Sequence, residues 1–414
     1  MAPAMRAKIH FICNGVFSTS IAGGDVHFLK LAESAARAGY ELNFFGGTAL
    51  REMIERHKLP GAVTLTDDVK MAKVNQGALR GQIAMFRDFF HRYRRTSRLL
   101  NRIAPEDYVY AVSDYWFDVL PAARSAARRK LMILHMEAPT FSQILWRGRP
   151  DVDGKRLASL HYFLSQKLSL STFRSCQNKR LLYVHPGMKP SLLRKGFQEG
   201  ELAFVSAGFD PTTAERIPEQ AKQFDVAWIG RVHRQKGIDD LMATLAHLAA
   251  KLPDFKTIII GTVENQLRPY AKKAGLENHL QFAGFVTEME KFRLLKASRL
   301  FLMPSHFESW GAVIAEALAA DLPVVAYELE AYPPVFGGLI RYVPPFNLQM
   351  FQSAAWDELC RARAGHLQPD LAALSAFKQK YAWEAVSARF VQVLDSLADD
   401  ESRSPSLPAE RNPA

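Results

Sequence analysis

Two glutamates that bracket the start of a predicted helix, Glu308 and Glu316, are the residues best suited to chemistry in this sequence. Glu308 lies in the loop after the apolar run 300–303, and Glu316 lies about one and a half turns into the following helix. Because the neighbours of Glu316 are small and apolar, its burial demands a partner, and ribose hydroxyls are suitable donors to a carboxylate. The pattern alone also fits an exposed loop acid at Glu308 and a structural salt bridge at Glu316.

The residues between these glutamates offer backbone amides to an anion. Ser309, Trp310, Gly311 and Ala312 span the expected helix start, where amides have no partner within the helix. The positive end of the helix dipole adds to their attraction for a diphosphate. Gly311 has no side chain, so the backbone there can approach a ligand closely.

A second anion site is predicted where an apolar strand over 225–230 ends. Gly230 and Arg231 end this strand, and Lys236 directly precedes the helix expected from Gly237. Two cations at the positive end of a helix would be satisfied by a diphosphate. Ordinary solvated loop charges would give the same local pattern.

Apolar strands alternate with helices on both sides of these loops. In the first half the predicted strands are 8–14, 42–45, 108–112 and 131–135, and the predicted helices are 26–38 and 116–129. In the second half the predicted strands are 225–230, 257–261, 279–283, 300–303 and 323–326, and the predicted helices are 237–251, 264–274, 287–297 and 310–320. This alternation predicts an α/β protein with two doubly wound, Rossmann-like parallel sheets that bind ligands at the carboxyl ends of their strands.

The length of the chain supports two domains, since 414 residues exceed what one hydrophobic core usually serves. Gly208 and Pro211 interrupt any regular pattern, so we predict an N-terminal domain over 1–208 and a C-terminal domain over 209–378. The cleft between two domains is the natural place for a ligand. Residues 399–414 have neither periodicity nor an apolar face, and we predict a disordered tail there.

Composition excludes several classes of protein. No stretch reaches the roughly 18 apolar residues of a spanning helix, and the start of the chain lacks a signal-peptide core. The 3 cysteines are widely spaced, which fits neither a disulfide framework nor a zinc site and favours a cytoplasmic protein. Residues 1–200 hold 31 Lys and Arg against 16 Asp and Glu, whereas the remainder is net acidic. A basic half attracts a nucleic acid, an anionic membrane or a phosphorylated acceptor.

One segment of the basic half, residues 86–102, interleaves aromatic residues with six arginines. As a helix it can place Phe86, Phe89, Phe90, Tyr93 and Leu100 on one side while Arg94, Arg95, Arg98 and Arg102 project elsewhere. That layout is typical of an interfacial helix on an anionic membrane. A packed domain helix with a solvated basic face explains the same pattern.

Together these motifs resemble the GT-B glycosyltransferases of family four, also called glycosyl transferases group 1. Glu308 and Glu316 match the family's Glu-x7-Glu motif, and residues 230–237 are similar to its Gly-Arg-x4-Lys-Gly phosphate segment. Phe285 and Val286 resemble the turn that contacts the nucleobase.

The resemblance extends into the first half of the chain and covers roughly residues 8–398. Gly24 is similar to a residue of the family's glycine loop, and His135 is similar to the strand-end histidine beside the reacting sugar. Residues 379–398 resemble the closing helix, which in relatives returns to the first domain. The resemblance thus implies the GT-B architecture, with two Rossmann-like domains facing across a cleft.

The resemblance implies a retaining glycosyltransferase that moves a sugar from a nucleoside diphosphate sugar to an acceptor hydroxyl. Arg231 and Lys236 would stabilise the leaving diphosphate, so no metal and no cofactor is expected. Glu308 would hold the sugar, Glu316 the ribose, and His135 would contact the sugar from the opposite domain. The implied acceptor is a saccharide or a lipid-linked molecule in cell-envelope polysaccharide or glycolipid synthesis, at the inner face of the cytoplasmic membrane.

Two segments depart from the usual pattern of this family. Tyr-Glu-Leu-Glu-Ala-Tyr over 327–332 replaces a Gly-rich loop that faces the acceptor or the sugar, and Asn347 stands where an acid is frequent. The donor sugar and the nucleobase are therefore left unassigned.

Other functions stay open on the sequence. GT-B sheets also support sugar-nucleotide epimerases and phosphorylases. A nucleic-acid-binding protein would use the basic half, but the arginine run carries no recognised motif and the second half is acidic, so we expect no nucleic acid.

Overall fold

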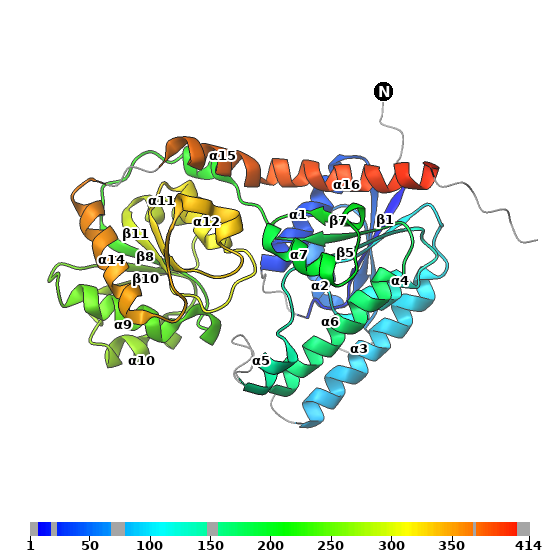
Figure 1. Cartoon of the computed structure of the whole chain (residues 1–414), viewed down its shortest axis with the longest axis horizontal. Coiled ribbons are helices and arrows are strands. Elements are labelled where there is room, and N and C mark those ends of the chain that lie inside the picture. The colour runs from blue at the N-terminus through cyan, green and yellow to red at the C-terminus, as the bar shows by residue number, and fades with distance from the viewer. Residues whose placement is uncertain (1–6, 18–22, 68–78, 147–155, 367–369, 404–414) are drawn as a thin grey trace, which may run out of the picture.

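The computed structural model describes residues 7–17, 23–67, 79–146, 156–366 and 370–403. It shows two α/β lobes, and the last two helices of the described chain lie along one side of them, one over each lobe (Figure 1). None of the helices within the described ranges combines the length and the hydropathy that a membrane span requires.

The first lobe is a parallel sheet packed against helices. Within the described residues, seven strands follow the order β3-β2-β1-β4-β5-β6-β7. They are β1 (Lys8–Cys13), β2 (Glu41–Gly46), β3 (Ala62–Leu65), β4 (Tyr108–Ala111), β5 (Arg129–Leu134), β6 (Lys179–Tyr183) and β7 (Leu202–Phe204). The helices are α1 (Gly23–Arg37), α2 (Thr48–Arg56), α3 (Leu79–Leu100), α4 (Trp116–Ala123), α5 (Phe141–Trp146), α6 (Arg156–Arg174) and α7 (Lys189–Arg194), with short turns η1 (Pro186–Met188) and η2 (Glu199–Glu201). Central strands such as β4 are buried throughout, which explains their apolar sequences.

The second lobe repeats this plan. Its described strands follow the order β10-β9-β8-β11-β12-β13. They are β8 (Phe224–Ile229), β9 (Thr257–Ile260), β10 (Leu280–Gly284), β11 (Ser298–Met303), β12 (Val324–Tyr327) and β13 (Arg341–Val343). The helices are α8 (Pro211–Glu215), α9 (Ile238–Ala249), α10 (Glu264–Lys273), α11 (Glu288–Lys296), α12 (Ala312–Ala319), α13 (Pro333–Phe336), α14 (Leu348–Arg363) and α15 (Leu371–Tyr381), with turns η3 (Arg234–Lys236) and η4 (Gly337–Leu339). The predicted fold class, two doubly wound parallel sheets, is confirmed.

The strand order reverses at one point in each sheet. β1 pairs with both β2 and β4, and β8 pairs with both β9 and β11, in parallel in every case. In open α/β sheets the crevice beside such a reversal is where ligands bind. The loops that follow β8 and β11 carry Arg231 and Glu308, so both predicted motifs lie at the reversal of the second sheet.

Helix α16 (Trp383–Arg403) returns to the first lobe, as the family resemblance implies (Figure 1). Its residues Phe390 and Leu394 are fully buried in the first-lobe core. The hydroxyl of Tyr108 donates to the carbonyl of Leu394, over 3.0 Å. Helix α16 thereby joins the core of a domain far from it in sequence.

The predicted tail is wrong for residues 399–403, because α16 continues to Arg403. Asp400 pairs with Arg180 and Glu401 with Arg129, at 2.5 and 2.8 Å. These arginines of the first lobe hold the last turn of the helix in place. Residues 404–414, the rest of the predicted tail, lie outside the described residues.

The two connections between the lobes lie side by side. The amide of Phe209 donates to the carbonyl of Tyr381, and the amide of Trp383 donates to the carbonyl of Phe209. The boundary predicted at 208–209 falls at this crossing.

Helices α1, α3 and α4 differ in extent from their predictions, and α3 runs over Leu79–Leu100 rather than over 86–102. Helix α1 begins at Gly23, so Gly23 and Gly24 form its first turn rather than a loop before it. Helix α4 ends at Ala123 instead of 129, because Ser125 and Lys130 donate to the carbonyl of Ala122 and so satisfy the end of the helix.

Candidate active site

The loops after β8 and β11 form a single structure. The amide of His306 donates to the carbonyl of Gln235 (2.7 Å), and the side chain of Gln235 donates to the carbonyl of Phe307 (2.6 Å). Gly237 has a φ of 61°, and a Cβ there would lie 1.9 Å from the carbonyl oxygen of Pro304. Only glycine permits that approach. The two motifs predicted separately from the sequence are therefore one constellation.

A mostly buried ion pair joins the two loops. Lys236 Nζ lies 2.5 Å from Glu308 Oε1, and the side chains are 16% and 11% exposed. Each of these charges has lost most of its hydration, so each is stabilised by the other, and removing one would leave the other unpaired. Arg231 is exposed on the same loop as Lys236. At Gly230, before it, a Cβ would lie 2.6 Å from the ring of Trp228, so a side chain has no room.

Three residues missed by the sequence predictions support this loop pair. His306 Nε2 and the hydroxyl of Tyr327 both contact Asp240 Oδ2, at 2.8 and 2.9 Å. Burial would raise the pKa of Asp240, but the hydrogen bonds from His306 and Tyr327 outweigh it and lower the pKa. The ionised carboxylate ties the loop after β11 to α9 and β12. The separation of these residues in the chain left no sequence signal for the contact.

Glu316 is paired through space with a lysine of the neighbouring helix. Its Oε1 lies 2.8 Å from Lys291 Nζ, and Lys291 also lies 2.9 Å from Glu288. Burial raises the pKa of Glu316, and Lys291 acts in the opposite direction. The salt bridge that the sequence left open as an alternative is thus present.

The start of α12 is shaped by Gly311, whose φ is 90°. The side chain of Trp310 is buried and packs against Phe336, so it belongs to the core, and only the backbone of Trp310 remains a candidate for the site. Ser309 is partly buried in the same loop, and Ala312 is exposed as the first residue of the helix.

Tyr332 comes from the loop that departs from the family pattern, and it lies directly behind this helix start. A Cβ on Gly311 would lie 2.9 Å from Tyr332 Cε1. Burial raises the pKa of Tyr332 well above its ordinary value, and the charge of Glu308 adds to the effect. The unusual loop therefore supplies an apolar wall to the constellation.

The turn after β10 presents an aromatic face. Gly284 has a φ of 67°, and Phe285 after it is 89% exposed. Val286 is partly buried and packs against the core. An exposed aromatic ring next to an anchored turn can stack with a flat ligand.

In the first lobe, Gly24 and His135 lie together. A Cβ on Gly24 would lie 3.6 Å from His135 Nε2, and this nitrogen is buried without a hydrogen-bond partner in the described part of the chain. The ring of His27 packs edge-on against His135, with centroids 5.7 Å apart. Burial lowers the pKa of His135 to about 4 and that of His27 to about 3, so both rings are neutral near pH 7.

The basic helix α3 is packed more deeply than the sequence indicates. Phe89 and Leu100 are buried, so the predicted apolar side divides between core and surface. Arg94 and Arg98 are exposed on the helix, Arg95 is partly buried, and Arg102 lies in the turn after it.

Arg92 of the same helix is buried, so not all arginines of α3 belong to an exposed basic face. It pairs with Asp88 (2.8 Å) and Asp67 (3.5 Å) and donates to the carbonyl of Asn14 (3.1 Å). These partners explain how an arginine is tolerated in the lobe.

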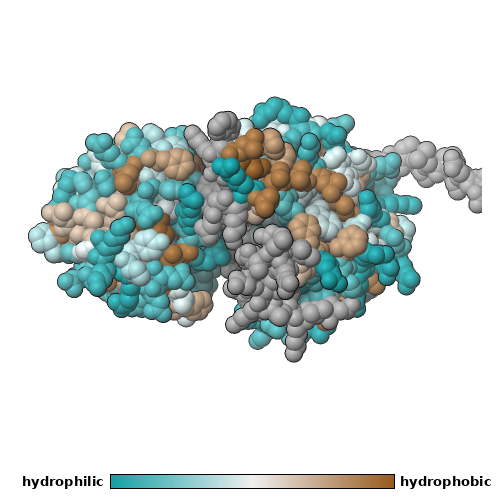
Figure 2. Space-filling view, turned by 90° about the horizontal axis from the view of Figure 1, so that it is seen from below, coloured by the Kyte–Doolittle hydropathy of each residue, from teal (hydrophilic) through white to brown (hydrophobic). Residues whose placement is uncertain are grey.

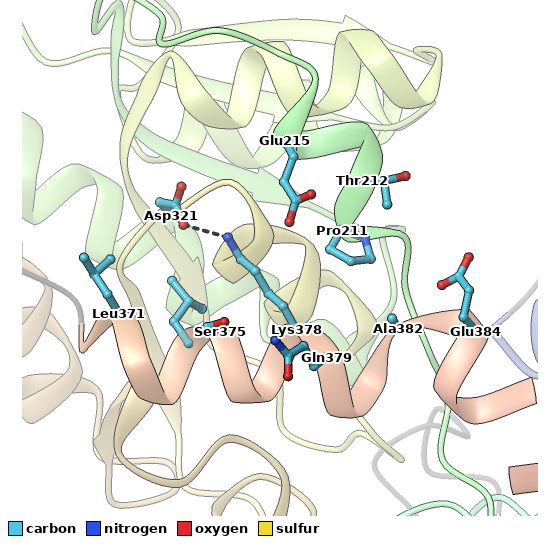
Figure 3. Close-up of a pocket in the computed structure, with 11 residues that line it drawn as sticks. Pro211, Thr212, Glu215, Asp321, Leu371, Ser375, Lys378, Gln379, Ala382 and Glu384 are labelled. Carbon is cyan, nitrogen blue, oxygen red and sulfur yellow. Dashed lines mark hydrogen bonds and ion pairs between the residues drawn. The ribbon is translucent and has the colours of Figure 1, made fainter. Parts of the chain in front are cut away.

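A separate hollow of about 610 Å³ lies between α8 and α15 (Figure 3). Pro211 and Leu374 line it, and Lys378 crosses it to reach Asp321 at 2.9 Å. It contains none of the predicted site residues, so it is distinct from the constellation above.

The second lobe matches the model of the family described as glycosyl transferases group 1, over residues 210–339. Among curated proteins, the chain is similar to phosphatidyl-myo-inositol mannosyltransferase of Mycolicibacterium smegmatis, with 26% identity over 64% of this chain and 71% of that protein. It is also similar to lipopolysaccharide core biosynthesis mannosyltransferase LpsB of Rhizobium meliloti, with 32% identity over 31% of this chain and 39% of that one.

Two solved structures share the fold. Sucrose-phosphate synthase from Thermosynechococcus elongatus superposes with a TM-score of 0.67 and 15% identity, covering 95% of this chain and 100% of that one. Anabaena HepE in complex with UDP and glucose superposes with a TM-score of 0.65 and 18% identity, covering 94% and 100%.

Proposed function

We propose that this chain, a group 1 glycosyltransferase with the GT-B fold, moves a sugar from a nucleoside diphosphate sugar to an acceptor hydroxyl with retention at the anomeric carbon. The observation that carries the proposal is the joining of two loops at the reversal of the second sheet, where Lys236 meets Glu308. Relatives named as mannosyltransferases, and a structural neighbour solved with UDP and glucose, support a nucleotide-sugar donor.

Positive charge for the leaving diphosphate comes from the second lobe. Arg231 is exposed beside the loop pair, Lys236 lies within it, and the amides at Gly311 and Ala312 begin α12. Preorganised donors of this kind stabilise charge that develops in the transition state. We therefore also propose that transfer needs no divalent metal.

The remaining groups bind the sugar and the nucleoside. Glu308 engages Lys236 through Oε1, which leaves Oε2 to accept hydrogen bonds from sugar hydroxyls. Glu316 accepts from the ribose, while Phe285 stacks with the base and the backbone of Val286 contacts its edge.

The first lobe contributes His135 beside Gly24. Because burial lowers the pKa of His135 to about 4, the neutral ring exchanges hydrogen bonds with a sugar hydroxyl rather than supplying charge. Closure of the lobes would bring it to the donor sugar.

We propose that the acceptor is lipid-linked and that the first lobe rests on an anionic membrane surface. The relatives' names include phosphatidyl-myo-inositol and lipopolysaccharide core, which supports a cell-envelope glycolipid. Apolar side chains gather on the side of this lobe that is seen from below in Figure 2. Leu157, Leu164 and Leu168 of α6 are exposed at helical spacing. Phe86 and Phe90 of α3 are exposed as well, and the ring of Phe86 lies 4.8 Å from that of His161 of α6.

Charge supports the same occupant. Helix α6 contains Arg156, Lys167 and Arg174 and no acidic residue, and Arg94 and Arg98 of α3 are exposed. An apolar stripe bordered by basic residues fits a bilayer of anionic lipid. The surface therefore involves α6 as well as the predicted α3.

A ligand screen tests the donor proposal. Thermal shifts with UDP-, GDP-, ADP- and TDP-sugars should reveal one stabilising nucleotide, and Glu308→Gln and Glu316→Gln should reduce that shift. Glu290→Gln, which removes only a surface partner of Arg293, serves as the control. Stabilisation by none of the four would contradict the proposal. Release of an isomerised nucleotide sugar would indicate an epimerase, and the anomeric configuration of the product tests retention.

A further inference from the structure

Lys291 lies between two carboxylates at the edge of the proposed nucleotide site. Its Nζ is 2.8 Å from Glu316 Oε1 and 2.9 Å from Glu288 Oε1. Its side chain is only 12% exposed, whereas that of Glu288 is mostly exposed. The ammonium also lies 5.1 Å from the ring of Phe292. Lys291 is thus held from several sides, and Glu316 is its inner partner.

The pairing leaves one oxygen of Glu316 available. The ion pair is made at Oε1, 2.8 Å from Lys291 Nζ, and a carboxylate has a second oxygen that can accept a hydrogen bond from a ligand. Glu316 is 20% exposed, and its neighbours on α12, Ala315 and Ala317, are fully buried alanines that cannot hold the carboxylate in one orientation. Lys291 is the polar group that can do so.

We propose that Lys291 is a positioning residue that fixes the Glu316 carboxylate for the ribose of the donor and so makes the site selective for ribonucleotides. This inference rests on the proposed role of Glu316. Lys291 occupies Oε1, which turns Oε2 towards a ligand as a preorganised acceptor. A 2′-deoxy or 3′-deoxy nucleotide lacks a hydroxyl and leaves the second oxygen of Glu316 without its hydrogen-bond donor in the bound state.

A purely structural role for Lys291 is the competing explanation. An ion pair between α11 and α12 would stabilise the lobe without affecting which nucleotide binds. Stability and selectivity must therefore be measured separately.

The experiment is calorimetric titration of UDP, GDP and ADP, each with its 2′-deoxy and 3′-deoxy counterparts. For the tightest nucleotide, removal of the contacted hydroxyl should weaken binding to the unsubstituted protein by about 10- to 100-fold. Lys291→Met should abolish most of this preference, and Lys291→Arg should restore it. Arg293→Met is the matched control, because it removes a surface ion pair of the same helix and does not contact Glu316.

The outcomes separate the two proposals. If the unsubstituted protein binds the deoxy nucleotides as tightly as the ribonucleotide, or if Glu316→Gln keeps the full preference for the ribonucleotide, the role of Glu316 fails. If that dependence exists and Lys291→Met retains it, the positioning role of Lys291 fails alone, whatever happens to the melting temperature. Should Lys291→Met not fold, Lys291→Gln permits the same comparison, since it keeps a donor but loses the charge.

Discussion

Lys236 Nζ lies 2.5 Å from Glu308 Oε1, so the cation proposed for the diphosphate and the carboxylate proposed for the sugar form one ion pair. Each side chain is mostly buried, and removing one leaves the other charged and poorly hydrated. The pair is therefore both a structural element of the loops and a part of the proposed chemistry, and these two roles can be separated by mutation.

Lys236→Met and Glu308→Gln should each lower the free energy of unfolding by about 1–3 kcal/mol, less than for a fully buried pair because both groups retain some exposure. The double variant should recover part of that loss, since no unpaired charge remains. All three should reduce kcat/KM by about 100-fold or more. Urea denaturation and initial rates measure both effects. Strictly additive losses of stability would contradict the coupling.

Gly237→Ala should damage the site more than an equivalent change elsewhere. Its φ is 61°, and the new Cβ would lie 1.9 Å from the Pro304 carbonyl, so we expect about 3 kcal/mol of destabilisation and loss of activity. Gly275→Ala is the control, since its φ is 69° but nothing lies within 4 Å. That variant should lose about 1 kcal/mol and keep its activity. Equal effects of the two changes would refute the close approach.

The loops of the candidate site follow buried strands, which is why their places in the fold could be predicted from the sequence. The motifs of Arg231 and Glu308 each come after a strand, and parallel strands end at one edge. The order of the strands in the sheet, however, could not be predicted from the sequence. That β8 and β11 are neighbours, and that Lys236 therefore meets Glu308, required the structure.

The residues that the sequence predictions missed stand in sequence patterns typical of an exposed helix surface. Lys291 follows Glu288 at helical spacing, which is typical of a solvated helix face. Only packing of α11 against α12 brings it to Glu316. Similarly, the arginines of α3 looked equivalent, and burial of Arg92 against Asn14 depends on a contact far away in the chain.

Acidification should destabilise the first lobe through His135. Burial lowers its pKa from 6.5 to about 4, so between these values the unfolded chain binds more protons, and stability falls as the pH falls. From pH 7 to pH 5 we expect a loss of about 1–2 kcal/mol from this group. His27, the titratable neighbour of His135, has a pKa of about 3, so it adds a further loss of stability on acidification. His135→Gln should flatten the dependence, measured as melting temperature against pH.

The control for this pH dependence is His57→Gln, a change at an exposed histidine of the same lobe. It should leave the slope unchanged. A His135→Gln protein with the original slope would show that other groups govern the acid sensitivity.

Removal of divalent metal should leave transfer intact. Arg231, Lys236 and the start of α12 are proposed to meet the charge of the leaving diphosphate, so rates in excess EDTA should stay within about twofold of those with Mg²⁺. Initial rates with the donor identified by the ligand screen provide the measurement. A rate that collapses in EDTA and returns on adding Mg²⁺ or Mn²⁺ would overturn the metal-independent proposal.

Leu157→Glu combined with Leu164→Glu should release the protein from anionic membranes. Both leucines are exposed on α6, and each change replaces an apolar contact with a charge that anionic lipid repels. In flotation with vesicles of phosphatidylglycerol and phosphatidylethanolamine, binding should fall by at least about tenfold. Leu371→Glu, at an exposed leucine of the second lobe, should bind as before. Binding that also persists with pure phosphatidylcholine at high salt would contradict the electrostatic part, and binding unaffected by the α6 changes would exclude this surface.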